Sequence, residues 1–190
     1  MRKIYLQVST HWDREWYRPY QEFRYRLIGV TDKIFDQTTK KEHFRKFFFD
    51  GQTIVIENYL GLLPQNREKV ADLIREGSIE IGPWYVMPDE CLVSGESLIR
   101  NFLQGRQVCR EFGVKPYPYG YVNDVFGHIA QFPQLMNQIG IHMTYQSRGL
   151  SGAGQDMRHF IWEAPDGSQC YGYKCNYADA YEVYGKFLNS

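Results

Sequence analysis

Hydrophobic positions along the chain follow two different periods, one typical of strands and one typical of helices. Near the N-terminus, Ile4, Leu6 and Val8 recur at every second position, which predicts a short strand that ends before Thr10. From about Tyr20 to Thr38, apolar residues recur instead at helical spacing. The chain therefore begins with a strand that is followed by a helix.

The same alternation continues along the rest of the chain. Further strands are expected at 44–50, 78–85, 117–124 and 141–148, and further helices at about 52–75, 95–112 and 132–139. Pro64 is expected to interrupt the first of these helices, and residues 159–175 predict a hairpin that turns at Asp166 and Gly167. Strands that alternate with helices are typical of α/β folds with a parallel sheet or barrel.

Length and charge narrow the class of protein. A chain of 190 residues with 43% hydrophobic residues can bury one core, which predicts a single domain over residues 1–190. Lysine plus arginine equals aspartate plus glutamate at 22 each, so no long-range field would attract nucleic acid or an anionic membrane. No apolar run is long enough to span a bilayer. We therefore expect a small-molecule ligand that is neutral or only locally charged.

The cysteines and the N-terminus bear on the compartment. Cys91, Cys109, Cys170 and Cys175 form no C-x-x-C pair, and the N-terminal residues enter the first strand without an apolar signal segment. A reduced, cytoplasmic compartment is therefore expected. We interpret Cys170 and Cys175 as small thiols of the protein interior rather than as half of a zinc site.

Charged and aromatic residues gather where the predicted strands end, which is where parallel α/β folds bind their ligands. They are His11 and Asp13 after the first strand, Asp50 after the second, Trp84, Asp89 and Glu90 around and after the end of the third, Asp124 at the end of the fourth and Arg148 at the end of the fifth. In extended backbone, His11 and Asp13 point to one face, as an imidazole and a carboxylate that share a cation would. A histidine held by a neighbouring aspartate has the same spacing, so this pair alone leaves both interpretations open.

Asp124 favours a metal site, because a carboxylate at the end of another central strand would add a third ligand. One nitrogen and two oxygens suit zinc. Residues 11–16 resemble the H-x-D-x-x-W segment of glycoside hydrolase family 38 α-mannosidases, and residues 123–128 resemble their D-x-F-G-H segment. The order and spacing of the two segments match as well. Blocks at 50–52, 82–90 and 94–101 are similar to the family's intervening sequence, especially in bacterial members.

The resemblance implies a zinc-dependent retaining α-mannosidase that acts on an α-mannoside or another mannosyl compound. It implies that His11, Asp13 and Asp124 bind zinc, and that Asp124 is also the nucleophile and forms a covalent glycosyl ester. It further implies that Trp16 and Phe126 pack against the bound sugar. Other candidates for substrate contact are Arg148, which matches by its distance after the nucleophile, Trp84, and Asp89 or Glu90. The alternatives are that Arg148 is a surface residue, that Trp84 belongs to the core, and that Asp89 and Glu90 only cap loops.

The same resemblance indicates which parts of the family are missing from these residues. The family's fourth zinc ligand and its general acid lie in later segments that have no counterpart here, and the strands are too few for its incomplete (β/α)7-type barrel. We therefore expect residues 1–190 to be the N-terminal part of the catalytic domain, without the downstream helical and β domains and with little activity by themselves.

Two other classes of function stay open. Metal-dependent polysaccharide deacetylases use a related partial barrel, but they carry two histidines four residues apart, and the position four residues after His128 is Phe132. The chain could also be a carbohydrate-binding or structural piece, which would bind sugar weakly and without a metal.

Overall fold

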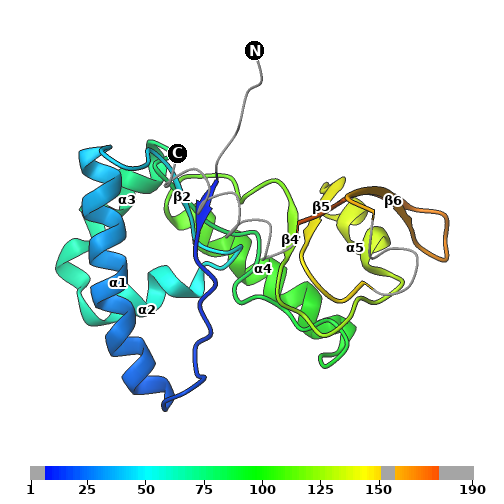
Figure 1. Ribbon diagram of the computed structural model, residues 1–190, viewed down its shortest axis with the longest axis horizontal. Coiled ribbons are helices and arrows are strands. Elements are labelled where there is room, and N and C mark those ends of the chain that lie inside the picture. Colours follow the sequence, from blue (N-terminus) through cyan, green and yellow to red (C-terminus); the bar gives the residue numbers. More distant parts are fainter. Residues whose placement is uncertain (1–6, 151–156, 176–190) are drawn as a thin grey trace, which may run out of the picture. The chain divides into compact units, whose positions relative to one another are not determined.

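The computed structural model describes residues 7–150 and 157–175, where helices and strands follow the order expected from the sequence (Figure 1). The chain divides into two compact units. Unit 1 consists of Met1–Val86 and Arg100–Tyr117, and unit 2 of Met87–Ile99 and Pro118–Ser190.

Unit 1 contains a three-stranded parallel sheet in the order β1-β2-β3. The strands are β1 at Val8–Ser9, β2 at Phe47–Phe48 and β3 at Ile79–Glu80. Val8 pairs with Phe47 and Phe47 pairs with Ile79, and both pairings are parallel. The three strands therefore run in the same direction. This direction agrees with the prediction from alternating strands and helices. The expected strand positions Ile4 and Leu6 lie outside the described residues.

Helices follow each of the three strands of unit 1. They are α1 at Tyr20–Lys40, α2 at Ile54–Leu62, the 3-10 helix η1 at Pro64–Asn66, α3 at Arg67–Arg75 and most of α4, which covers Gly95–Glu111. Pro64 begins η1 directly after α2 has ended, which confirms the predicted interruption, because proline has no N–H to continue the helix. Gly77 follows α3 with a φ of +75°, the left-handed conformation that glycine adopts easily at a helix end.

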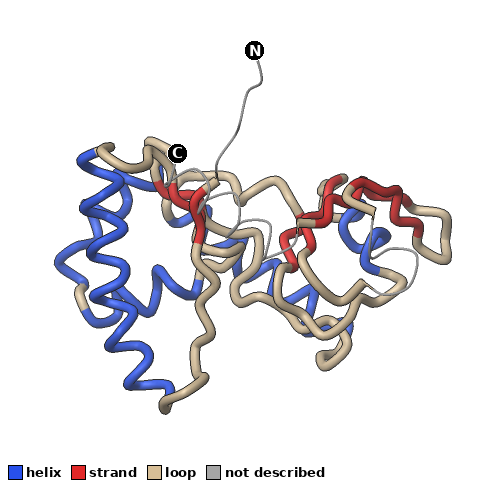
Figure 2. The backbone as a smooth tube through the Cα atoms, in the orientation of Figure 1, coloured by secondary structure: helices blue, strands red, loops and turns tan. Residues whose placement is uncertain are grey.

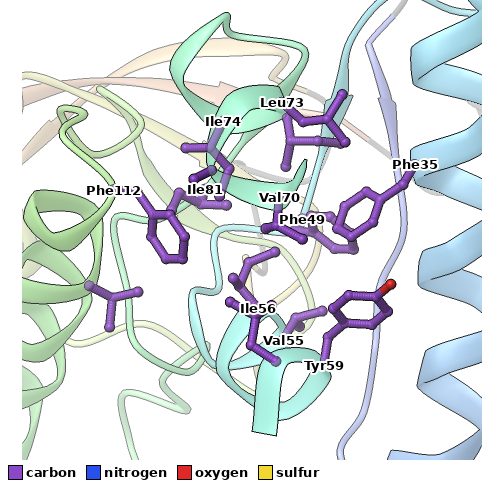
Figure 3. Close-up of a cluster of buried hydrophobic side chains, with 14 of the residues drawn as sticks. Phe35, Phe49, Val55, Ile56, Tyr59, Val70, Leu73, Ile74, Ile81 and Phe112 are labelled. Carbon is purple, nitrogen blue, oxygen red and sulfur yellow. The ribbon is translucent and has the colours of Figure 1, made fainter. Parts of the chain in front are cut away.

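The core of unit 1 is built from apolar side chains of the helices and of the segments around the strands (Figure 3). The ring of Phe35 in α1 lies 6.2 Å from Phe49 and 5.2 Å from Tyr59 between centroids, edge to face in both pairs. The Tyr59 hydroxyl donates to Asp32 at 2.5 Å and accepts from Asn66 at 2.6 Å. Desolvation, followed by the bond to Asp32, raises the pKa of Tyr59 to about 12. Helices α1 and α2 are thus joined by packing and by a satisfied buried hydroxyl.

Helix α4 packs against the segment after β3 at Gly105. A Cβ atom at Gly105 would lie 2.5 Å from the carbonyl oxygen of Pro83 and 2.6 Å from the backbone nitrogen of Tyr85. We predict that Gly105→Ala lowers the free energy of unfolding by about 2 to 3 kcal/mol, because the clash is with backbone atoms, which cannot move aside as a flexible side chain can. Chemical denaturation measures this loss.

Gly95→Ala in the same helix is the matched control. A Cβ atom at Gly95 would meet nothing within 4 Å, and alanine is the better helix former, so stability should stay the same or rise slightly. If Gly105→Ala were as stable as Gly95→Ala, the close approach of α4 to the segment after β3 would be wrong.

Unit 2 contains a four-stranded sheet in the order β4-β5-β7-β6 (Figure 2). The strands are β4 at Gly120–Val122, β5 at Met143–Gln146, β6 at His159–Glu163 and β7 at Gln169–Lys174. Strands β4, β5 and β7 are parallel, and β6 is antiparallel to β7. The predicted hairpin is therefore confirmed, and its turn contains Gly167 with a φ of +83°.

Two helical segments lie in the described part of unit 2. Helix α5 at Phe132–Gln138 connects β4 to β5, and Gly140 follows it with a φ of +79°. The first turn of α4 is capped by Ser94, whose Oγ accepts the backbone N–H of Ser97 at 3.2 Å. Among the residues that the structure describes, no helix is both long enough and apolar enough to cross a membrane.

Each unit therefore has a mixed α/β fold with parallel strands that are joined by helices. That fold class was predicted from the strand and helix periods. The incomplete (β/α)7-type barrel and the single domain over residues 1–190 stay predictions.

Candidate active site

His11 lies between two carboxylates in unit 1. Its Nδ1 is 2.6 Å from Oδ2 of Asp50, and its Nε2 is 3.3 Å from Oδ1 of Asp13. The side chain of Asp50 is buried at 2% exposure, whereas that of Asp13 is 47% exposed. The imidazole thus has a buried carboxylate on one nitrogen and an accessible carboxylate on the other.

The turn after β2 places Asp50 against His11. Asp50 has a φ of +50° and Gly51 a φ of +72°, so the chain leaves the strand through two left-handed residues. Aspartate is one of the few residues other than glycine that adopt this conformation readily. The side-chain nitrogen of Gln52 donates to Oδ2 of Asp50 at 3.3 Å, and Gln52 also pairs with Trp84 in a parallel bridge. The Asp-Gly-Gln sequence therefore fixes the carboxylate that contacts the imidazole.

The position of Asp50 also sets the role of each ring nitrogen of His11. When Asp50 is ionised it accepts a hydrogen bond from Nδ1–H, so Nε2 is the ring nitrogen that faces Asp13. A carboxylate that holds the second nitrogen is the usual companion of a metal-binding histidine. The sequence predicted that Asp50 lies at a strand end, but it did not predict the contact between Asp50 and His11. The signal in the sequence for that contact was the Asp-Gly-Gln turn.

The two tryptophans predicted to contact sugar differ in exposure. Trp16 is 66% exposed. Trp84 is 1% exposed, and its ring lies edge-on to Phe102 with centroids 6.1 Å apart. Trp84 therefore packs in the interior of unit 1, as in the core alternative, and a sugar contact for either tryptophan stays a prediction.

In unit 2 the structure brings together Asp124, Arg148 and Phe126. Nε of Arg148 lies 2.8 Å from Oδ1 of Asp124, with the two side chains 47% and 25% exposed. The guanidinium carbon is also 4.8 Å from the ring centroid of Phe126, which is 72% exposed. The arginine thus contacts a carboxylate and an aromatic ring at the same time. A carboxylate oriented by a cation beside an exposed ring can serve as a nucleophile beside a sugar-binding face.

Asp89 and Glu90 separate into different environments. Oδ1 of Asp89 accepts the backbone N–H of Phe126 at 3.4 Å, next to the Asp124 group. Glu90 is 1% exposed, and its carboxyl group contacts His128 and the N–H of Ile129. Desolvation raises the pKa of Glu90, while its bonds to His128 and Ile129 act in the opposite direction. Of the pair, Asp89 remains the candidate for substrate contact.

The predicted zinc ligands are divided between the units, with His11 and Asp13 in unit 1 and Asp124 in unit 2. Over residues 7–150 and 157–175, no three histidine, cysteine, aspartate or glutamate side chains form a group that could hold a metal ion. The convergence of His11, Asp13 and Asp124 on one cation stays a prediction.

Comparison with known proteins supports the resemblance carried by the sequence motifs. The family model described as the glycosyl hydrolases family 38 N-terminal domain matches residues 1–185. The chain belongs to glycoside hydrolase family 38. A putative mannosylglycerate hydrolase of Halalkalibacterium halodurans is 40% identical in an alignment of 184 residues that covers 90% of this chain and 20% of that protein. Alpha-mannosidase 2 of Homo sapiens is 30% identical in an alignment of 151 residues that covers 76% of this chain and 13% of that protein.

Solved structures agree with this family and with the fold. An alpha-mannosidase from Enterococcus faecalis superposes with a TM-score of 0.82 at 34% identity, covering 91% of this chain and 20% of that chain. A 4-alpha-glucanotransferase from Thermococcus litoralis superposes with a TM-score of 0.60 at 13% identity over 87% of this chain and 27% of that chain, which shows a shared fold alone. The chain spans about a fifth of the length of its bacterial relatives. The family match gives no support to a polysaccharide deacetylase.

Proposed function

We propose that the full-length protein is a zinc-dependent retaining α-mannosidase and that this chain supplies its nucleophile, Asp124. The observation that carries the proposal is the pairing of Asp124 with Arg148 beside the exposed ring of Phe126, in a chain of family 38. The substrate would be an α-mannoside or another small mannosyl compound. The names of the relatives, an alpha-mannosidase and a putative mannosylglycerate hydrolase, support this class.

The chemistry of the donor set fits zinc. His11 would contribute Nε2, Asp13 and Asp124 would contribute carboxylate oxygens, and the buried Asp50 already holds the other nitrogen of His11. Zinc, when bound there, would supply a positive charge that keeps the carboxylates ionised and holds neighbouring hydroxyl groups of the sugar. In this proposal the parallel strands of both units belong to one incomplete (β/α)7-type barrel, which the structural match to the Enterococcus faecalis alpha-mannosidase supports.

The residues of unit 2 would carry out the first chemical step, the formation of the glycosyl ester. An oxygen of Asp124 attacks the anomeric carbon and forms a glycosyl ester, while the glycosidic bond breaks and the leaving oxygen takes a proton from a general acid expected in a later segment. Water then hydrolyses the ester and regenerates the carboxylate, so that the anomeric configuration is retained. Arg148 orients the attacking carboxylate, and Phe126 offers an apolar face to the sugar ring.

A trapping experiment on the full-length protein tests this proposal. A fluorinated mannosyl substrate with a good leaving group should leave one mannosyl group covalently attached, because the fluorine slows both steps while the leaving group keeps ester formation faster than ester hydrolysis. Peptide mapping by mass spectrometry should place the group on Asp124. A label on Asp50, Asp89 or Glu90, or an inverted anomeric product in the proton NMR spectrum, would contradict the assignment.

A further inference from the structure

A buried chain of hydrogen bonds in unit 2 lies next to the proposed reacting groups but is separate from them. Oε1 of Glu90 is 2.9 Å from Nδ1 of His128, and Nε2 of His128 is 2.9 Å from the carbonyl oxygen of Arg148. The side chains of Glu90 and His128 are 0% and 4% exposed. Three segments that are distant in the sequence are therefore joined through one imidazole ring.

Each hydrogen bond in this network has either a defined donor or a proton that lies between its two atoms. The carbonyl oxygen of Arg148 only accepts, so Nε2 of His128 carries a hydrogen. A proton also lies between Nδ1 and Oε1, whether the pair is an imidazolium with a carboxylate or a neutral imidazole with a carboxyl group. The other oxygen of Glu90 accepts the backbone N–H of Ile129 at 3.0 Å, which fixes the carboxyl group from a second direction.

Packing around His128 also holds the segments at His128 and Arg148 together, independently of these hydrogen bonds. The ring of Trp162 in β6 lies edge-on to the imidazole with centroids 5.3 Å apart. Gly149 has a φ of +89°, and a Cβ atom there would lie 2.9 Å from Nε2 of His128 and 3.2 Å from Cα of Gly127. The turn after Arg148 thus approaches the His128 segment so closely that a side chain would collide with the imidazole.

The hydrogen bond from His128 and the ion pair of Asp124 are two of the contacts that connect the segment at 123–128 to Arg148. His128 holds the backbone of Arg148, while Nε of Arg148 reaches Oδ1 of Asp124 at 2.8 Å, and Asp124 lies on the same segment as His128. The backbone N–H of Arg148 also donates to the carbonyl oxygen of Asn123 at 3.4 Å. Moving the backbone of Arg148 would therefore move its guanidinium relative to the carboxylate of Asp124.

We propose that Glu90 and His128 are positioning residues that hold Arg148 in place against Asp124. The inference rests on the proposed function, because it assigns the attacking carboxylate to Asp124. Glu90 and His128 are buried and act through Arg148 rather than on the substrate. Their loss should therefore lower kcat more than it changes KM, since a displacement of about 1 Å can cost about a hundredfold in rate.

Kinetics of the full-length protein with an aryl α-mannoside test the proposal. His128→Phe keeps a ring of similar size but cannot donate to Arg148, and it should lower kcat by about 10- to 100-fold. Glu90→Leu combined with His128→Phe removes both partners, so that no carboxyl group is left buried without its partner, and it should show the same loss. His142→Phe is the matched control, because His142 is an exposed histidine of unit 2 whose Nδ1 contacts Asn137; its kcat should equal that of the wild type.

A double-mutant cycle separates positioning from general destabilisation. Arg148→Met removes the guanidinium, so adding His128→Phe to it should cause no further loss of kcat if His128 acts through Arg148. Glu90→Gln should keep most of the wild-type activity, because its amide can accept from Ile129 and donate to Nδ1 of His128. Losses that multiply when His128→Phe is added to Arg148→Met, or a Glu90→Gln variant as impaired as the Glu90→Leu/His128→Phe double variant, would overturn the proposal.

A crystal structure of the His128→Phe variant tests the inference without relying on activity. The separation between Nε of Arg148 and the carboxylate of Asp124 should increase beyond 4 Å, and an unchanged ion pair would overturn the inference. A wild-type protein that hydrolyses no mannoside would instead refute the proposed function, and the crystal structure would still decide whether Glu90 and His128 hold the arginine.

Discussion

Replacement of Asp124 by alanine should abolish hydrolysis of an aryl α-mannoside by the full-length protein, with kcat/KM lowered at least about 10,000-fold, as for the loss of other covalent nucleophiles. Three effects combine in this variant. The attacking oxygen is removed, and so is one of the three proposed zinc ligands of this chain. Arg148, which contacts Asp124 at 2.8 Å, also loses its anionic partner. Steady-state kinetics measure the loss.

Three further variants separate these effects. Asp13→Ala should act through the metal alone, so added zinc should partly restore turnover in Asp13→Ala but not in Asp124→Ala. Asp124→Asn keeps an oxygen that can bind metal while losing nucleophilicity, so it should retain zinc better than Asp124→Ala. Asp72→Ala, at an exposed aspartate of α3 that contacts Arg75, is the control and should be as active as the wild type. Zinc-restored activity in Asp124→Ala would remove Asp124 from the covalent step.

The helices could be predicted closely from the sequence, whereas the paired parts of the strands could not. Helix α1 was expected at about Tyr20–Thr38 and covers Tyr20–Lys40, because its apolar spacing is long and regular. The third strand was expected at 78–85, but β3 covers only Ile79–Glu80. Alternating residues indicate two faces of an extended segment, but they do not show where hydrogen bonding to a neighbour stops. Here the chain turns at Gly82, which has a φ of +76°.

The candidate site was predictable where it depends on residues close in sequence. The contact of His11 with Asp13 follows from their two-residue spacing, and the grouping of Asp124 with Phe126 follows from one short motif. The bond between His11 and Asp50 depends on the left-handed turn at Asp50, which no periodic pattern shows.

Both units contain the same arrangement of a histidine and a buried carboxylate. In unit 1 the buried Asp50 holds Nδ1 of His11, and in unit 2 the buried Glu90 holds Nδ1 of His128. The second nitrogen differs, because Nε2 of His11 faces Asp13, whereas Nε2 of His128 donates to a backbone carbonyl. Nε2 of the first histidine thus faces a carboxylate that is 47% exposed, whereas the second histidine is buried and both of its nitrogens contact other parts of the fold. This difference favours His11, rather than His128, as the metal ligand.

Zinc affinity should consequently depend on Asp50 even though Asp50 is not proposed as a ligand. Asp50→Asn removes the charge that orients and polarises His11 and should weaken zinc binding by about 10- to 100-fold, the usual effect of losing such a partner. His11→Ala removes a ligand and should weaken binding more than Asp50→Asn does. Competition with a chelator of known affinity, followed by elemental analysis of the full-length protein, measures both effects.

Two controls show whether weaker zinc binding by Asp50→Asn results from the lost charge. His43 is an exposed histidine outside the motifs, so His43→Ala should bind zinc as tightly as the wild type. Asp50→Asn must also unfold at the same denaturant concentration as the wild type in the absence of zinc, so that weaker binding is not a consequence of unfolding. If the folded Asp50→Asn variant bound zinc with wild-type affinity, the carboxylate would only stabilise the turn after β2. If His11→Ala also bound zinc normally, the metal would lie elsewhere, and His11 would be a histidine held between two aspartates for structural reasons alone.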